Sequence, residues 1–379
     1  MGEAKYRVGV VGIGRAGTTR ARAFDKHPLC QVTAIADTDP ENLELGCRRF
    51  GARGYSTYEE MFAKEEVDIA MPVLPVNANA GAVIAAAQAG ARAIFCEKPL
   101  TASLADADRM VEECRSRGVH LGAGVMVSSH RDYIKAYELV AAGELGQVQR
   151  INLYEGNAQG GCHGLNLMRK FAGKAEVEWV TGWVGGDAHS DNEEPYEEGM
   201  TGFGALGGHI HFANGVECFS HFEDVRWRGI EIVGSRGLLY NWNNTAIGLK
   251  LFKADGEPRN RADLREVEGL FGEHNADPRD YDEEGWMHPG EVMLGIVESI
   301  VGSLEEGREL AITTGDDLRH ALEVAIALRE SARRGGTPVK LPLEDRSLVM
   351  YPEKWRWHYK KDLWGREKYM GQMKQHRDI

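Results

Sequence analysis

The sequence of 379 residues has few cysteines, no long apolar run and no excess of basic residues. Its six cysteines are scattered singly, without the paired spacing of a zinc site or the density of a disulfide scaffold, so we interpret them as thiols. No window reaches the roughly 20 apolar residues of a membrane span. The N-terminal MGEAKYRVGVVG also lacks the apolar core of a signal peptide. We therefore expect a cytoplasmic protein without a membrane partner.

The charge balance argues against nucleic acid as a partner. Lysine and arginine number 45 against 58 acidic residues, for a formal net charge of -13. A nucleic-acid surface needs a basic stripe that displaces counterions from phosphates. With 42% apolar and 27% charged residues the chain resembles an ordinary globular protein, and its length suits two domains.

Strands and helices alternate in the first part of the chain. Apolar runs predict strands at 7–11, 32–36, 67–73, 91–96 and 120–125, and the segments between them predict helices at 16–26, 40–50, 77–89 and 104–117. This alternation predicts an α/β domain with a doubly wound parallel sheet. In such a sheet, ligands bind outside the carboxyl ends of the strands.

The loop after the first strand, VGVVGIGRAG, has the glycine spacing of a dinucleotide-binding turn. Asp37 closes the second strand 20 residues after Gly17, where a carboxylate can bind the adenosine ribose and repel a 2'-phosphate. The sequence therefore predicts NAD as cofactor. The alternative is that the glycines serve only a tight turn and that Asp37 belongs to the turn ADTDP. The predicted cofactor contacts in the loop are Gly12, Ile13, Gly14, Arg15, Ala16 and Gly17.

The next site candidates follow the strand at 67–73. Pro75 and Asn79 stand in a loop that, in a doubly wound sheet, lies beside the nicotinamide half of the cofactor. Proline and asparagine are also ordinary helix-start residues, so both interpretations stay open.

The strand at 91–96 runs directly into Glu97, Lys98 and Pro99. An ammonium at a strand tip can stabilise an alkoxide, and the neutral amine can accept a hydroxyl proton. We predict Lys98 as a catalytic residue and place Glu97 and Lys98 among the cofactor contacts. The alternative is a solvated Glu-Lys pair at the end of a strand.

The order of a GxGxxG loop, an acidic second-strand end and an EKP motif resembles the glucose-fructose oxidoreductase, inositol dehydrogenase and rhizopine-catabolism family, Gfo/Idh/MocA. The resemblance implies that the EKP lysine lies in the active site and that the cofactor is NAD or NADP. It implies a Rossmann domain, placed at 1–125, and an α+β domain with a large open, mostly antiparallel sheet, placed at 126–345. A tail at 346–379 with Trp355, Trp357 and Trp364 would wrap a neighbouring subunit or cover a pocket.

Strands with short connections fill the second half. We predict them at 176–184, 203–213, 216–222, 226–233, 237–242 and 245–252. Because one face of an open sheet must be covered, we expect a homo-oligomer, a dimer or tetramer, built through the C-terminal sheet.

The segment GNAQGGCHGLNLMRKFAG resembles the family's active-site helix, in which an aspartate precedes a histidine by four residues and a second aspartate follows it by three. His163 stands at the histidine position, Gln159 at the first aspartate and Asn166 at the second. Amides hydrogen-bond hydroxyls but cannot take a proton, so base function would rest on His163 or Lys98. The alternative for His163 is a bond to local backbone. Asn157, Gln159 and Asn166 are the predicted substrate contacts.

Histidines elsewhere raise the question of a metal. Cys162 and His163 are chain neighbours, which rarely point at one ion, and His209 and His211 alternate on one strand after His189. We predict no metal site.

These features predict an NAD-dependent oxidoreductase that acts on a secondary hydroxyl of a sugar, cyclitol or glycoside. Lys98 and His163 would meet across one cleft and share the proton chemistry. The alternative is a redox-assisted glycoside hydrolase of the same fold, and a third interpretation is an NAD-binding sensor without turnover.

Overall fold

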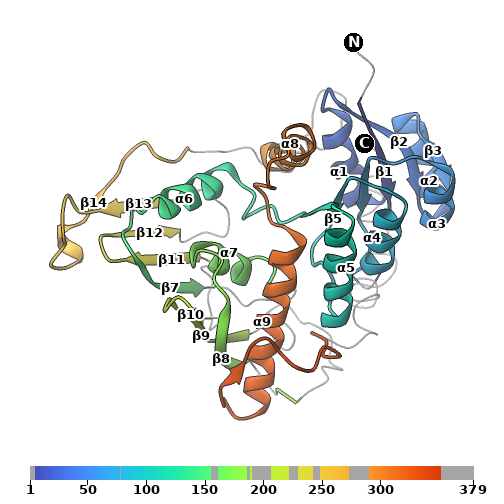
Figure 1. Cartoon of the computed structure of the whole chain (residues 1–379). Helices are drawn as coiled ribbons and strands as arrows, with labels where there is room; N and C mark the ends of the chain where they lie inside the picture. Colours follow the sequence, from blue (N-terminus) through green and yellow to red (C-terminus); the bar gives the residue numbers. More distant parts are fainter. Residues whose placement is uncertain are drawn as a thin grey trace. The chain divides into compact units, whose positions relative to one another are not determined.

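The computed structural model describes residues 5–76, 78–154, 161–185, 188–189, 206–221, 229–241, 248–272 and 290–350 (Figure 1). Among them, 5–126 and 290–316 form one compact unit, and 127–272 and 317–350 form a second. We call these the first and the second unit. The first unit is discontinuous in sequence, whereas we predicted consecutive domains. The predicted tail, with its three tryptophans, lies outside the described residues from 351 onward.

Six parallel strands form the sheet of the first unit, in the order β3-β2-β1-β4-β5-β6. The strands are β1 (Tyr6–Val11), β2 (Cys30–Ala36), β3 (Arg53–Tyr55), β4 (Ile69–Pro72), β5 (Ala93–Cys96) and β6 (His120–Ala123). The helices are α1 (Arg15–Asp25), α2 (Pro40–Phe50), α3 (Tyr58–Lys64), α4 (Asn79–Gln88), α5 (Leu104–Ser116) and α8 (Gly290–Glu306). The predicted doubly wound fold is confirmed. The sequence did not predict β3, because its three residues are exposed or half-exposed and form no apolar run, and it did not predict the short helix α3.

Helices cover both faces of this sheet. Val10 of β1 belongs to a core cluster with Phe24 of α1 and Ile296 of α8. Val11, the next residue, belongs to a second cluster with Ala82 of α4. Successive strand residues point to opposite faces, so the two clusters lie on the two sides of the sheet. Each fully buried large apolar side chain, such as Phe24, stabilises the fold by about 1.5–3 kcal/mol.

The second unit contains a nine-stranded sheet in the order β14-β13-β12-β11-β7-β10-β9-β8-β15. All neighbouring strands pair antiparallel except β7 and β10, which are parallel. The strands are β7 (Val148–Tyr154), β8 (Val177–Val184), β9 (Leu206–Phe212), β10 (Glu217–His221), β11 (Gly229–Gly234), β12 (Gly237–Asn241), β13 (Lys250–Lys253), β14 (Arg265–Glu266) and β15 (Val339–Lys340). The helices are α6 (Arg131–Ala141), α7 (Gly164–Phe171) and α9 (Gly315–Arg333), with a 3-10 turn η1 (Arg261–Asp263). This confirms the predicted open, mostly antiparallel sheet.

The two faces of this sheet differ in character. One face carries fully buried apolar side chains such as Val180, Ile210 and Ile232. The strand register places stacked rings on the other face, among them Trp179 against His211 and His209 against Phe219. We call this second face the aromatic sheet face. Its members are Tyr154, Trp179, His209, His211, Phe219, His221, Tyr240 and Phe252.

Candidate functional site

The glycine loop after β1 is built so that backbone lies close to backbone. Gly12 has a φ of +87°, and a Cβ there would lie 2.5 Å from the carbonyl oxygen of Val73. A Cβ on Gly17 would lie 1.9 Å from the carbonyl oxygen of Gly12. No side chain larger than hydrogen fits at either position. The loop can therefore pass directly from β1 into the N-terminus of α1, where backbone N–H groups favour a bound phosphate.

The remaining loop residues leave this helix end open. Gly14 precedes α1 in an extended conformation, and no side chain caps the helix there. Ile13 is buried in the core, Arg15 is exposed and Ala16 is half-buried. The first turn of α1 carries no acidic side chain that would repel an anion. The loop thus fits the pyrophosphate of a dinucleotide.

Asp37 stands at the end of β2 and its carboxylate bridges two segments. Its Oδ2 accepts the backbone N–H of Ile13 at 2.7 Å, and its Oδ1 accepts that of Asp39 at 2.8 Å. Asp39 in turn caps α2, accepting the backbone N–H groups of Glu41 and Asn42. A ribose hydroxyl can share these acceptor oxygens, whereas a 2'-phosphate would meet two carboxylates. The geometry fits a dinucleotide without that phosphate.

The loop after β4 places its two predicted contacts differently. Pro75 is exposed. Asn79 is buried at the start of α4, and its Nδ2 lies 3.3 Å from the carbonyl oxygen of Glu97, 3.1 Å from that of Pro99 and 3.3 Å from that of Leu100. These hydrogen bonds of Asn79 are therefore with the EKP segment and the residue that follows it.

Lys98 lies half-buried directly after β5, and the Lys98-Pro99 peptide bond is cis. Beside it, the Glu97 carboxylate Oε2 accepts a hydrogen bond from Nε of Arg20, on α1, at 3.2 Å. The glycine loop, Asp37 and Lys98 thus follow the carboxyl ends of β1, β2 and β5 in one parallel sheet. This is the edge at which the doubly wound fold binds ligands.

Arg20 is a residue of the candidate site that we did not predict, although its place on α1 carries a signal. Arg20 lies three residues after Gly17 and four before Phe24, both of which are buried, so it stands on the inward face of α1. A charged residue on an inward helix face predicts a buried partner.

In the second unit, His163 is half-buried at the N-terminus of α7 and makes no side-chain capping hydrogen bond there. Asn166, three residues on, is fully buried and donates from Nδ2 to the hydroxyl oxygen of Ser128 at 3.1 Å. The predicted substrate contacts Asn157 and Gln159 lie outside the described residues. Lys98 belongs to the first unit and His163 to the second, and their meeting across one cleft stays a prediction.

Charged side chains are buried in the last turn of α7. Arg169 pairs with Asp317 of α9 at 2.8 Å, with side chains 7% and 2% exposed. The neighbouring Lys170 is also buried, and burial lowers its pKa to about 8, although Asp317 acts in the opposite direction. Burial, with Arg169 and Arg319 nearby, lowers the pKa of His320 to about 3, so this imidazole is neutral. Because unpaired buried charge is costly, Asp317 is essential to this cluster.

Helices that open with predicted site residues differ from the other compared helices in how their N-termini are capped. The side chains of Asp39, Thr57, Ser103 and His130 cap α2, α3, α5 and α6. By contrast, α1, α4 and α7 begin at Gly14, Ala78 and His163 without a side-chain cap. These three helices are the ones that open with predicted site residues.

No group of three or more metal-ligating side chains is found within the described part of the chain. Glu217 instead bridges His209 at 2.5 Å and His211 at 2.7 Å. Burial raises the pKa of the Glu217 carboxyl, but these two hydrogen bonds outweigh it and hold the pKa below its ordinary value. Among the same residues, no helix is both long and apolar enough to cross a membrane.

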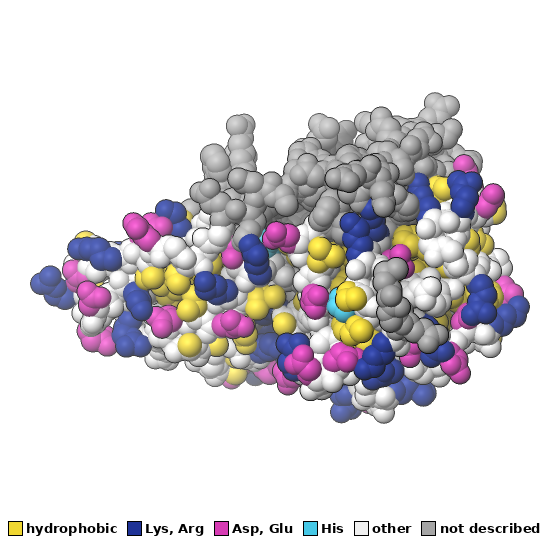
Figure 2. Space-filling model, turned by 90° about the horizontal axis from the view of Figure 1, so that it is seen from above, with side chains coloured by type: hydrophobic (Ala, Val, Ile, Leu, Met, Phe, Trp, Pro, Cys, Tyr) yellow, Lys and Arg dark blue, Asp and Glu magenta, His cyan; other side chains and the backbone are white. Residues whose placement is uncertain are grey.

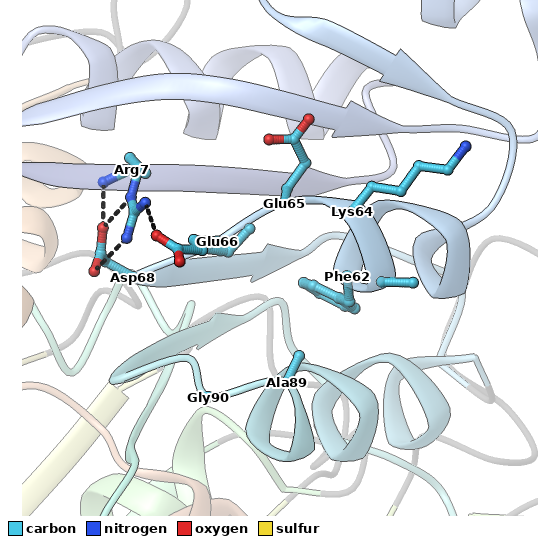
Figure 3. A pocket seen from close by; sticks show the side chains of 10 residues that line it. Arg7, Phe62, Lys64, Glu65, Glu66, Asp68, Ala89 and Gly90 are labelled. Atoms are coloured by element: carbon cyan, nitrogen blue, oxygen red, sulfur yellow. Dashed lines mark hydrogen bonds and ion pairs between the residues drawn. The ribbon is translucent and has the colours of Figure 1, made fainter.

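An open hollow of about 410 Å³ lies at the amino ends of β1 and β4, the edge of the sheet opposite the glycine loop (Figure 3). Arg7 occupies one side of it and is paired with Glu66 and Asp68. Lys64 points away from this group (Figure 3), and Glu65 pairs with Arg53. Because each of its charged side chains is already ion-paired, the hollow does not resemble a ligand site.

Comparison with known proteins supports the assignment of the first unit. Residues 6–125 match the Gfo/Idh/MocA model, an oxidoreductase family with an NAD-binding Rossmann fold. The myo-inositol 2-dehydrogenase of Thermotoga maritima is 33% identical over 142 residues, which cover 37% of this chain and 42% of that protein. The 2,7-anhydro-N-acetylneuraminate hydratase of Escherichia coli is 30% identical over 140 residues, 37% of each chain. The matched region thus spans about two fifths of these relatives.

A solved structure extends the likeness in fold to both units. The WlbA dehydrogenase from Bordetella pertussis, in complex with NADH and UDP-GlcNAcA, superposes with a TM-score of 0.68 at 18% identity. The superposition covers 91% of this chain and 100% of that one. It shows a shared two-domain fold.

Proposed function

We propose that this chain, whose residues 6–125 belong to the Gfo/Idh/MocA family of oxidoreductases, is an NAD-dependent oxidoreductase that acts on a secondary hydroxyl of a sugar, cyclitol or glycoside. One observation carries the proposal: the glycine loop, Asp37 and Lys98 follow the carboxyl ends of strands in the same parallel sheet. Phosphate binding, ribose binding and proton chemistry are thereby available along one edge.

The residues of the first unit fit NAD. The open N-terminus of α1 would hold the pyrophosphate, and Asp37 would hold the adenosine ribose while disfavouring a 2'-phosphate. When bound, NAD supplies a hydride acceptor. The family description and the NADH in the WlbA complex support this choice.

Two side chains of this chain are suited to the proton. Lys98 can take the hydroxyl proton as a neutral amine or stabilise the alkoxide as an ammonium. His163, at the N-terminus of α7, carries an imidazole, the side chain most often used for proton transfer in enzymes. Asn166 donates to Ser128 and supports the start of α7. Its amide cannot act as a base.

The substrate class rests on the relatives. Their names describe action on inositol and on an anhydro sugar acid, and the WlbA complex contains a sugar nucleotide. Charges of both signs are interspersed on the face shown in Figure 2, which suits a small ligand better than a polyanion.

We further propose that the second sheet carries a homo-oligomer interface on its aromatic sheet face. Trp183, on the same face, is 38% exposed, and the stacked rings beside it are half-buried. Half-exposed aromatic side chains on an open sheet are typical of surfaces that a second copy covers. Light scattering of the purified chain and of a Trp183→Glu variant tests this, with a smaller mass expected for the variant.

A substrate panel tests the main proposal. Purified protein and NAD are incubated with sugars, cyclitols and glycosides, and both the NADH absorbance and the products are followed. NADH formation with at least one secondary alcohol is expected. Silence in both measurements across the panel would instead favour an NAD-binding sensor.

A second candidate is redox-assisted glycoside hydrolysis. A relative named as a hydratase of an anhydro sugar and the amide Asn166 at an aspartate position favour altered proton chemistry. In this reaction the hydride would be removed, the aglycone eliminated, water added and the hydride returned, so that no NADH accumulates. Glycone release in D₂O with deuterium at the carbon beside the anomeric centre would distinguish it from simple dehydrogenation.

A further inference from the structure

One buried amide holds the chain on both sides of Lys98. Asn79 is 1% exposed, and its Nδ2 lies within 3.3 Å of three carbonyl oxygens, those of Glu97, Pro99 and Leu100. An amide nitrogen has only two hydrogens, so the three oxygens share them. Because the bonded carbonyls precede and follow Lys98, the backbone at the lysine is fixed relative to α4.

A charged pair holds the same turn from α1. Nε of Arg20 lies 3.2 Å from Oε2 of Glu97, and the two side chains are 19% and 12% exposed. Gly124, after β6, closes the other side, because a Cβ there would lie 3.1 Å from the same Glu97 oxygen. The pair strongly restricts the position of the Glu97 side chain, because separating a largely buried pair leaves each charge uncompensated.

We propose that Asn79 and Arg20 are positioning residues for Lys98: Asn79 fixes the backbone around the lysine, and Arg20 acts through Glu97. The inference rests on the proposed role of Lys98 in proton transfer. It gives Asn79 a different role from the cofactor contact that its loop suggested. Arg20 also joins the helix that would hold the pyrophosphate to the turn that carries the lysine.

The expected effects follow from how sharply reaction rates depend on geometry. Displacing a reacting group by about 1 Å can lower a rate by about 100-fold. Asn79→Asp replaces the donor by an oxygen that faces three carbonyl oxygens, so we expect kcat to fall by about 100-fold. Arg20→Met should lower kcat by about 10-fold, and Arg20→Lys, which keeps the charge, should recover part of that loss.

Asn214→Asp is the control for the chemical change alone. Asn214, in the second unit, also donates from its amide to a carbonyl oxygen, that of Ala172, at 2.9 Å. The chemical change is the same but is remote from Lys98 in sequence and in unit. Because Asn214 is exposed, its Asp variant should keep both stability and kcat, whereas kcat should fall in Asn79→Asp.

Two readouts separate positioning from simple destabilisation. The first is the pH profile of kcat, whose limb should shift in Asn79→Asp and Arg20→Met and stay unchanged in Asn214→Asp. The second needs no turnover: the pH dependence of Lys98 acetylation, read from peptide masses, should change in the same two variants. NAD binding, measured by calorimetry, should change by less than about threefold, because the phosphate and ribose contacts are intact.

The outcomes are distinguishable. If Lys98→Met is inactive while both Arg20→Met and Asn79→Asp match the wild type in kcat, pH profile and acetylation, the positioning inference is wrong and the proposed function stands. If Lys98→Met is fully active, the proposed function itself fails. If Asn79→Asp does not fold, the comparison of Arg20→Met with Arg20→Lys decides: equal kcat in both variants would overturn the role of Arg20 and, with it, the inference.

Discussion

The two units support their predicted site residues in different ways. In the first unit, Lys98 follows a buried strand, the carbonyl oxygens of its neighbours accept from the amide of Asn79, and Glu97 is held by one ion pair. In the second, His163 opens a helix in which all eight residues are buried, including the charged Arg169 and Lys170. The glycine loop of the first unit obtains its geometry from backbone, which a short motif reveals, although the turn at Lys98 also depends on Asn79 and Arg20. The second unit depends on charged side chains supplied by distant segments, which motifs do not reveal.

The largest expected effect concerns Lys98 and tests how the first unit supports its site. Replacing Lys98 by methionine keeps much of the side-chain volume but removes the amine, so we expect turnover to fall by about 1000-fold. NAD affinity should stay within about threefold, because the glycine loop and Asp37 are unchanged. Steady-state kinetics and calorimetry measure the two quantities. Lys64→Met, on the exposed end of α3, is the control and should be fully active.

The buried cation of the second unit gives the next effect. The pKa of Lys170 is lowered from 10.5 to about 8. Below pH 8 the amine is protonated in both the folded and the unfolded chain, and its burial costs the folded state about 3 kcal/mol. Between pH 8 and 10.5 the unfolded chain binds more protons than the folded one, so the free energy of unfolding rises with pH.

Lys170→Met should therefore stabilise the protein at pH 7 by up to about 3 kcal/mol, with a smaller gain at pH 10. Denaturant unfolding at both pH values measures this. Lys340→Met, an exposed lysine on β15, is the control. An equal gain at both pH values would show that better apolar packing, and not the buried charge, is responsible.

The sequence predicted the fold of both units because periodicity and turn residues are local signals. The glycine spacing and Asp37 also predicted the phosphate and ribose end of the candidate site, since each depends on a short segment. The sequence did not predict that residues 290–316 pack with the first sheet, because the apolar face of α8 does not specify which core it joins.

The parts of the site that the sequence left open depend on long-range pairs. Arg20 and Glu97 are 77 positions apart, and Arg169 and Asp317 are 148 apart. The local sequence around each residue does not indicate which distant residue it pairs with. The loop of Asn79 predicts either a cofactor contact or an ordinary helix-start residue, and only the structure shows its amide directed at the carbonyl oxygens of Glu97, Pro99 and Leu100.

His163 tests whether the two units share one proton step. His163→Asn keeps a polar side chain but removes the base, and we expect turnover to fall by about 100-fold. If Lys98 and His163 act on the same proton, the double variant should be little worse than Lys98→Met alone. Fully multiplicative losses would indicate independent roles and would separate the two units chemically.

A substitution of Asp37 tests the predicted cofactor contacts and should have a smaller effect. Asp37→Ser removes the carboxylate that accepts the Ile13 N–H, so we expect about 10-fold weaker NAD binding and an improved ratio of NADP to NAD. Asp39 keeps its charge nearby, so a complete switch is not expected. Calorimetry with both cofactors measures the ratio, and an unchanged ratio would remove Asp37 from cofactor selection.

The smallest effect concerns the difference between helices with a side-chain cap, such as α3, and the uncapped helices that open with predicted site residues, such as α4. Thr57 caps α3 by accepting the backbone N–H of Glu60, so Thr57→Ala should lower the free energy of unfolding by about 1 kcal/mol. Ala78, before α4, already has helical backbone angles, whereas a capping residue needs an extended backbone. Ala78→Thr should consequently give no comparable gain in denaturant unfolding. A stabilisation of about 1 kcal/mol in that variant would show that α4 merely lacks a suitable side chain, and that its open start is unrelated to the site.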